Sequence, residues 1–296
     1  MGLGCAQQAS CNASGLCIYK DTACKTASVF QNGTTKHCLQ KRLCQSELSI
    51  PLATVILVSS KIFQEAVAVT AKQVRIGDRP CRIYGTDCAE YLLLQMTDEH
   101  ELQNMDSEVE AIAQGSAHSF LFAAVLVNSW NDELSPWEAP AVWGKESFGG
   151  NAAGTLRFLT EQAIPTLKKQ FALPENVRII LGGYSLAGLF ALWASTQTAL
   201  FSSVAAASPS VWFPGWMEFE RQCPIQAQHI YLSLGDREER TRSATMAAVG
   251  GNIRTMYREL SERGKNCSLE WNIGEHFKDA DLRTARAFRW VMEDMR

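Results

Sequence analysis

The chain has 296 residues, of which 46% are hydrophobic and 20% are charged. This length and composition are typical of a globular protein with a sizeable core, either one large α/β domain or a domain with an appendage. The net charge is -3, but residues 1–72 carry seven Lys and Arg against three Asp and Glu, a balance of +4 that leaves -7 for the rest. The acidic main body argues against a nucleic-acid partner.

The first 50 residues differ in composition from the rest of the chain. They hold six of the ten cysteines: Cys5, Cys11, Cys17, Cys24, Cys38 and Cys44. Their spacing fits no zinc-ligand pattern, so we expect no metal site. We treat residues 1–50 as a cysteine-rich segment of unknown role, either an appendage, a poorly ordered tail or sequence upstream of the translation start. Residues 51–296 form the predicted main domain.

Two features of the N-terminal part of the sequence argue against a secreted or membrane-spanning protein. Met1 is not followed by the charged and apolar regions of a secretion signal. The apolar run at 51–60 is too short to span a bilayer. We therefore expect a cytoplasmic protein with no membrane partner.

Strand patterns alternate with helical patterns along the main domain. Strands are predicted at 54–58, 65–74, 81–84, 90–96, 120–127, 177–181, 204–207, 229–234 and 267–273. Helices are predicted at 107–114, 152–171, 186–198, 244–262 and 282–295, with Pro165 kinking or splitting the second of them. This alternation implies right-handed crossovers, and hence an α/β fold with a mostly parallel central sheet and helices on both faces.

Ser185 stands where a β-branched strand passes directly into a long apolar helix. Gly183 precedes it by two residues and Ala187 follows it by two. Small residues are needed at both places because the backbone comes close on either side of such a turn. The pattern is G-x-S-x-G with Ala in the last place, the nucleophile elbow that exposes a serine hydroxyl. The alternative interpretation is a glycine-rich turn whose serine merely caps the helix.

A serine hydroxyl becomes a good nucleophile only when a base takes its proton, and that base needs an acid to orient it. In this kind of fold the acid and then the histidine follow the serine in the chain. Only His276 follows a predicted strand at the expected place, since His37, His100 and His118 precede the serine and His229 begins a strand.

Three carboxylates compete for the role of the acid. The strand that ends at Leu234 opens into Gly235, followed by Asp236, Glu238 and Glu239. We prefer Glu238, which can turn back across the strand ends towards the histidine, with Asp236 as the second choice and Glu239 as the third.

Two further sets of residues complete the predicted site. An oxyanion needs two backbone N–H donors, one from the residue after the serine and one from the loop after an earlier strand. These are Leu186 and either Met96 or Thr97. Tryptophans on two loops at the same strand ends could line a substrate pocket or could simply anchor those loops to the core: Trp137, Trp212 and Trp216.

Four segments together resemble the esterase D-like family of α/β-hydrolases. They are G-G-Y-S-L-A-G-L-F-A-L-W around Ser185, S-P-S-V-W after Ala207, L-G-D-R-E-E around Glu238 and G-E-H-F around His276. The resemblance covers residues 74–296 and is closest to the siderophore-esterase branch. It implies an α/β-hydrolase fold with Ser185 as nucleophile, His276 as base and Glu238 as acid. The loop after Met96 departs from the family pattern because it lacks the common glycine.

We therefore predict a serine hydrolase that cleaves small-molecule carboxylic esters through an acyl-enzyme intermediate, without a cofactor or metal. Acyl transfer to an alcohol other than water would use the same triad. A non-catalytic α/β-hydrolase-fold protein that binds a ligand or partner is the alternative from another functional class. The sequence leaves the substrate and the oligomeric state open.

Overall fold

The computed structural model of the chain describes residues 8–11, 16–21, 26–31, 70–142 and 144–293, in two compact units, Met1–Glu65 and Ala66–Arg296. The described residues of the first unit form an antiparallel sheet of three strands, β1 (Gln8–Cys11), β2 (Leu16–Asp21) and β3 (Thr26–Gln31). The sequence pattern did not predict these strands because they are short and show no regular alternation. The predicted boundary after residue 50 and the predicted strand at 54–58 lie outside the described residues and stay predictions.

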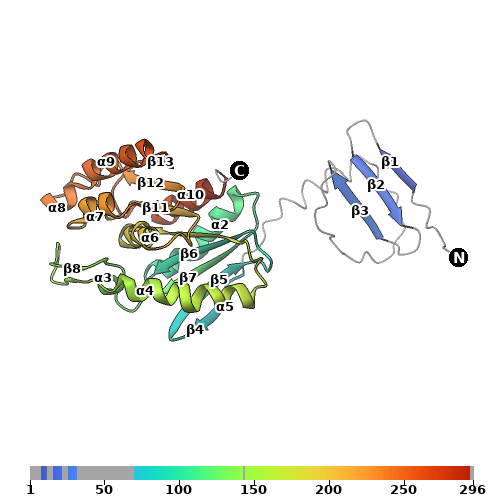
Figure 1. The fold of residues 1–296 in the computed structure, drawn as a ribbon, viewed down its shortest axis with the longest axis horizontal. Helices are drawn as coiled ribbons and strands as arrows, with labels where there is room; N and C mark the ends of the chain where they lie inside the picture. The colour runs from blue at the N-terminus through green and yellow to red at the C-terminus, as the bar shows by residue number, and fades with distance from the viewer. Residues whose placement is uncertain (1–7, 12–15, 22–25, 32–69, 143, 294–296) are drawn as a thin grey trace. The chain divides into compact units, whose positions relative to one another are not determined.

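The second unit is built on one eight-stranded sheet with the order β13-β12-β11-β10-β6-β7-β5-β4 (Figure 1). Its strands are β4 (Lys72–Ile76), β5 (Arg79–Gly85), β6 (Tyr91–Thr97), β7 (Phe120–Leu126), β10 (Arg178–Tyr184), β11 (Ser203–Ala207), β12 (His229–Gly235) and β13 (Asn266–Asn272). The six strands from β13 to β7 are parallel, whereas β5 is antiparallel to both β4 and β7. The predicted mostly parallel sheet is therefore confirmed.

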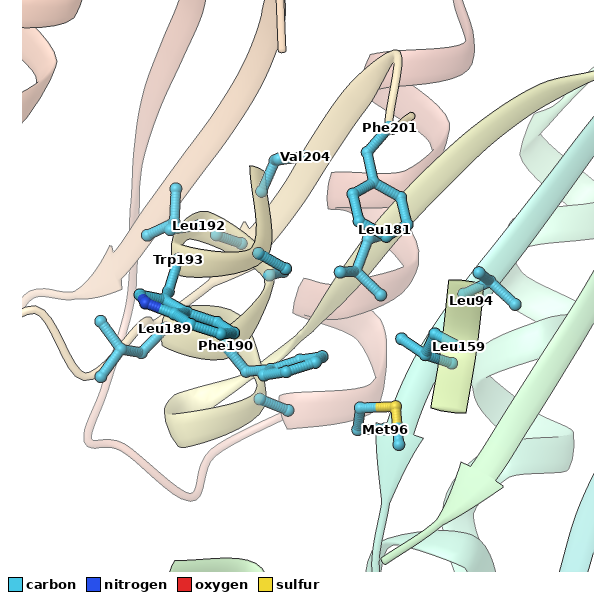
Figure 2. Packing of buried hydrophobic residues seen from close by; sticks show 14 of the residues in the cluster. Leu94, Met96, Leu159, Leu181, Leu189, Phe190, Leu192, Trp193, Phe201 and Val204 are labelled. Carbon is cyan, nitrogen blue, oxygen red and sulfur yellow. The ribbon is translucent and has the colours of Figure 1, made fainter. Parts of the chain in front are cut away.

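Helices cover both faces of this sheet, as predicted. One face carries α2 (Met105–Gly115) and α10 (Ala280–Glu293), and the other carries α4 (Ala152–Phe158), α5 (Ile164–Gln170), α6 (Ser185–Gln197) and α9 (Val249–Glu262). Successive side chains of a strand point to opposite faces, so each strand contributes to two separate apolar clusters. Figure 2 shows part of the cluster between α6 and the sheet, to which Phe190 of α6 and Leu181 of β10 both belong.

Pro165 divides the predicted helix at 152–171. Between α4 and α5 the chain forms η2 (Leu159–Ala163), a π-helical turn that ends directly before the segment with the proline. Proline has no N–H to donate and its ring crowds the preceding turn, so a regular α-helical ladder cannot continue through it.

Other differences from the predicted elements concern short or interrupted helices. The helix predicted at 244–262 consists of α8 (Ala244–Ala247) and α9. Residues 128–151, which lie between the predicted strand at 120–127 and the predicted helix at 152–171, include α3 (Trp130–Glu133) and a hairpin of β8 (Glu138–Ala139) and β9 (Phe148–Gly149). A further helix, α7 (Trp216–Gln222), was not predicted. Elements of two to seven residues are too short to show a reliable period.

The parallel arrangement brings three connections to the same edge of the sheet. They follow the carboxyl ends of β10, β12 and β13, and they carry Ser185, Glu238 and His276 respectively. In open α/β sheets, binding sites form at this edge. Within the described ranges, no helix has the length and apolar character needed to cross a membrane.

Candidate active site

Ser185 occupies a strained turn between β10 and α6. Its backbone φ is 56°, in the left-handed region that side chains other than glycine seldom adopt. A Cβ atom on Gly183 would come within 2.7 Å of the Cβ of Ala187. Glycine is therefore required at position 183 because Ala187 already fills the space, and this is the geometry that the nucleophile-elbow pattern predicts.

The imidazole of His276 lies between Ser185 and Glu238. Its Nε2 is 2.9 Å from the Oγ of Ser185, and its Nδ1 is 2.7 Å from the Oε2 of Glu238. Because Nδ1 faces a carboxylate, which can only accept, the Nδ1–H donates a hydrogen bond to Glu238, and the unprotonated Nε2 accepts one from the hydroxyl of Ser185. The His276 side chain is 27% exposed and that of Glu238 is 5% exposed, so the histidine can be reached by solvent while its partner is buried.

The structure separates the three carboxylates that compete for the role of the acid. Glu238 alone of the three contacts His276. Asp236 accepts a hydrogen bond from the backbone N–H of Gly274 at 2.8 Å, which joins the loops after β12 and β13. Glu239 pairs with Arg254, whose hydrogen bond holds the pKa of the Glu239 carboxyl below its usual value. Of the three carboxylates, Glu238 thus lies against His276 and the two others have other local partners, while its role as the acid stays a prediction.

The second oxygen of Glu238 is held by three donors that the sequence did not predict. Oε1 accepts hydrogen bonds from the Ser208 hydroxyl at 2.8 Å, from the backbone N–H of Gly235 at 2.7 Å and from the guanidinium of Arg283 at 3.1 Å. Arg283 also donates to the hydroxyl of Tyr184, whose pKa is raised to about 12 by burial and by the charge of Glu238. One feature of the sequence could have pointed to Arg283. It is a charged residue one helical turn before the buried Ala287, and so lies on the buried face of α10.

The two predicted oxyanion donors lie on neighbouring elements. Leu186 is in the first turn of α6, where backbone N–H groups have no partner within the helix. Met96 and Thr97 end β6, the strand that pairs with β10. The Met96 side chain is fully buried beneath α6 (Figure 2), and the carbonyl of Thr97 accepts from the N–H of Val127. The choice between Met96 and Thr97 stays a prediction.

The predicted pocket tryptophans have different environments. The indole N–H of Trp137 donates to the carbonyl of Pro214 at 2.9 Å, and its ring packs on Phe213, so this side chain anchors its loop. Trp212 is partly buried, and its ring makes an edge-to-face contact with that of Phe148. Trp216 is wholly buried and presents no surface to a ligand. A substrate contact therefore stays a prediction for Trp137 and Trp212.

One more hydroxyl lies beside the nucleophile. The Oγ of Ser210 is 3.4 Å from the Oγ of Ser185, and the N–H of Ser210 donates to the carbonyl of Ser185. These contacts fix the S-P-S-V-W segment against the elbow. Among the described residues, no group of three or more His, Cys, Asp and Glu side chains is placed to hold a metal ion.

Comparison with known proteins identifies relatives for this arrangement. The model of a family described as "Putative esterase" matches residues 102–273, more than half of the chain. The siderophore enterobactin esterase of Emericella nidulans is 30% identical over 169 residues, which cover 47% of this chain and 54% of that protein. The similarity thus spans about half the length of this curated relative.

Solved structures show the same fold at low sequence identity. The siderophore hydrolase EstA from Aspergillus nidulans is 17% identical with a TM-score of 0.59, over 86% of this chain and 100% of that one. The enterobactin esterase FES from Shigella flexneri has the same identity and TM-score, over 77% of this chain and 60% of that one. At this identity the likeness establishes the α/β-hydrolase fold alone. Because the family model matches more than half of a chain with this fold, the chain belongs to the esterase family of α/β-hydrolases.

Proposed function

We propose that this chain is a serine esterase that hydrolyses carboxylic esters through an acyl-enzyme intermediate. The observation that carries the proposal is the unbroken path of hydrogen bonds from Glu238 through His276 to Ser185. A serine so linked to a base with an oriented tautomer is an activated nucleophile. Membership of the esterase family supports ester hydrolysis as the reaction.

The proposed first half-reaction forms the acyl-enzyme. The Oγ of Ser185 attacks the ester carbonyl carbon while its proton passes to Nε2 of His276. The imidazolium that results is stabilised by the buried carboxylate of Glu238, and it then gives the proton to the departing alcohol. The N–H groups of Leu186 and Met96 are the proposed donors to the carbonyl oxygen as it becomes negative.

The second half-reaction returns the free enzyme. Water attacks the acyl group on Ser185 as His276 takes one of its protons, and the same proton then restores the serine hydroxyl as the carboxylic acid leaves. Apart from the ester and water, neither proposed half-reaction uses a group outside the chain. An alcohol in place of water would give acyl transfer, so product analysis with added alcohols separates the two reactions.

For the substrate class we propose siderophore esters. The curated relative is a siderophore enterobactin esterase, and the Shigella flexneri structure was determined in the presence of enterobactin. Enterobactin is therefore the first natural ester to test, after a short p-nitrophenyl ester has established activity. The cytoplasmic location stays a prediction from the sequence.

Ser185→Ala and His276→Ala test the proposal. Both variants should lose at least about a thousandfold in kcat for p-nitrophenyl acetate, because the triad acts as a unit. A fluorophosphonate probe should label the unaltered chain at position 185, fail to label Ser185→Ala and label His276→Ala much more slowly. His118→Ala is the matched control, since His118 packs on Tyr91 at the amino end of β6. Turnover that survives Ser185→Ala would disprove the proposal.

A further inference from the structure

Arg283 contacts all three chain segments that carry the proposed triad. We infer that it is a positioning residue, which holds the loops of Ser185, Glu238 and His276 in register. The inference rests on the proposed function. Arg283 lies near the start of α10, and its side chain is 2% exposed.

The guanidinium reaches the loops after β12 and β13 directly. Its Nη1 is 3.1 Å from the Oε1 of Glu238, and its Nη2 is 3.3 Å from the carbonyl oxygen of Ile273, three residues before His276. The guanidinium group is planar and presents its donors in a fixed fork. The two contacts therefore fix the loop after β12, which carries Glu238, relative to the loop after β13, which carries His276.

Tyr184 extends the same group of contacts to the nucleophile. The Nη1 of Arg283 is 3.0 Å from the hydroxyl of Tyr184, and that hydroxyl donates in turn to the carbonyl oxygen of His276. Tyr184 directly precedes Ser185 at the end of β10. The buried guanidinium of Arg283 is thus linked through Tyr184 both to the residue before Ser185 and to the backbone of His276.

Charge and hydrogen bonding explain why the acid needs such a partner. Glu238 is 5% exposed, and removing an ionised carboxylate from water is costly unless it is paired and hydrogen-bonded. Arg283, Ser208 and the N–H of Gly235 together occupy Oε1, which leaves Oε2 to His276. Without the guanidinium, the carboxylate would lose its charged partner and could rotate or recede from Nδ1 of the histidine.

Two substitutions of Arg283 distinguish a role in positioning Glu238 and His276 from a role in the stability of the fold alone. Arg283→Met keeps most of the apolar stem but removes both the charge and the fork. Arg283→Lys keeps the charge but cannot make the three contacts at once. The control is Arg286→Met on the same helix, because Arg286 instead contacts Glu270 and Asn272.

Steady-state kinetics with p-nitrophenyl acetate give the first measurement. We expect kcat to fall about 10- to 100-fold in Arg283→Met, with KM changed less than about threefold, since a misplaced catalytic group slows the chemistry more than it weakens binding. Arg283→Lys should lie between Arg283→Met and the unaltered chain, and Arg286→Met should match the unaltered chain. A folded Arg283→Met with unaltered kcat, a change in KM alone, or an Arg283→Lys equal to the unaltered chain would overturn the inference.

Proton NMR of the full chain gives a measurement that does not depend on turnover. The Nδ1–H of His276 should give a far-downfield resonance because it is bonded to a carboxylate, and Arg283→Met should shift or broaden it while Arg286→Met leaves it in place. If Arg283→Met does not fold, Arg283→Lys decides by the same resonance. If the unaltered chain cleaves no ester, the proposed function fails, whereas the resonance still supports or overturns the positioning role.

Discussion

Two serines beside the proposed nucleophilic hydroxyl and the proposed acid have strained backbones. Ser185 has a φ of 56° and Ser208, whose hydroxyl donates to Glu238, has a φ of 42°. Residues other than glycine adopt such values only where the surrounding structure holds them. Here that structure is the pair of strands β10 and β11, whose adjacent ends bring both serines to one place. The strain thus holds a nucleophile and a donor to the acid at fixed positions.

Two glutamates that each have a buried carboxyl oxygen, Glu101 and Glu108, should make the stability of the domain depend on pH. Burial, with the nearby charge of Asp98, raises the pKa of Glu101 to about 8, and burial raises that of Glu108 well above its usual value. The folded state therefore holds protons that the unfolded state releases above about pH 4.5. Their contribution to stability is full below that pH, and for Glu101 it is lost as the pH rises towards 8.

Glu101→Gln and Glu108→Gln remove this titration. Between pH 5 and pH 9, each variant should lose less free energy of unfolding than the unaltered chain. For Glu101→Gln the difference should be on the order of 4 kcal/mol, because a pKa of about 8 lies about three units above pH 5 and each unit corresponds to about 1.4 kcal/mol. Urea denaturation at both pH values measures the difference. Glu110→Gln on the exposed side of α2 is the control and should change nothing. Equal pH dependence in all four proteins would contradict the prediction.

The ends of the elements, rather than their middles, set the geometry of the site. Gly235 ends β12, and a Cβ there would collide with the carbonyl oxygen of Gly274 and come within 2.9 Å of the Oε1 of Glu238. Gly251 in α9 differs, because a Cβ there would meet nothing within 4 Å. Alanine at these two positions therefore tests whether the close packing of Gly235 against Glu238 affects stability and activity, with Gly251 as the control.

Gly235→Ala should destabilise the fold by about 1–3 kcal/mol, as overpacking does, and should lower kcat because the added methyl displaces Glu238. Gly251→Ala should stabilise the fold by about 0.5–1 kcal/mol, since alanine is the better helix former, and should leave kcat unchanged. Urea denaturation and p-nitrophenyl acetate kinetics measure both effects. If Gly235→Ala behaved like Gly251→Ala, the close approach at position 235 would have no energetic consequence.

Sequence patterns predicted the elements whose burial is uniform along their length. The strand at 120–127 and the helix at 186–198 are continuous apolar runs, and both lie within about one residue of β7 and α6. The sequence pattern did not predict α3 and α7, which depend on local backbone features. In α3 the N–H of Glu133 donates to the carbonyl of Ser129, and α7 begins directly after Gly215, whose φ is 79°. Such contacts leave no periodic signal.

At the scale of the whole molecule, chain order predicted which residues would meet at the site but not what supports them. Parallel strands bring their carboxyl ends to one edge, so the strand pattern predicted that the loops of Ser185, Glu238 and His276 would meet there. It did not by itself distinguish Glu238 from Asp236 and Glu239. Arg283 donates hydrogen bonds to Glu238 and to Tyr184, which lie 45 and 99 residues before it in the chain. No spacing rule links those positions, because the contact arises only when α10 packs beneath β10 and β12.

Cys81 should report on the unfolding of the large sheet. It lies in β5 between β4 and β7, it is 1% exposed, and burial raises the pKa of its thiol to about 11. Cys88 and Cys223 are exposed thiols of the same unit. Because the thiolate is the reactive form, a buried thiol with a raised pKa should react only when the sheet opens.

Alkylation with iodoacetamide at pH 8, followed by peptide mapping, measures the three thiols together. In the native protein, Cys88 and Cys223 should be modified rapidly while Cys81 is protected. As urea is added, the loss of protection at Cys81 should follow the loss of helical circular dichroism, since helices pack on the sheet in both apolar clusters and the unit should unfold cooperatively. If Cys81 reacted as fast as Cys88 without denaturant, the strand that holds it would open locally, and the eight-stranded sheet would not unfold as one unit.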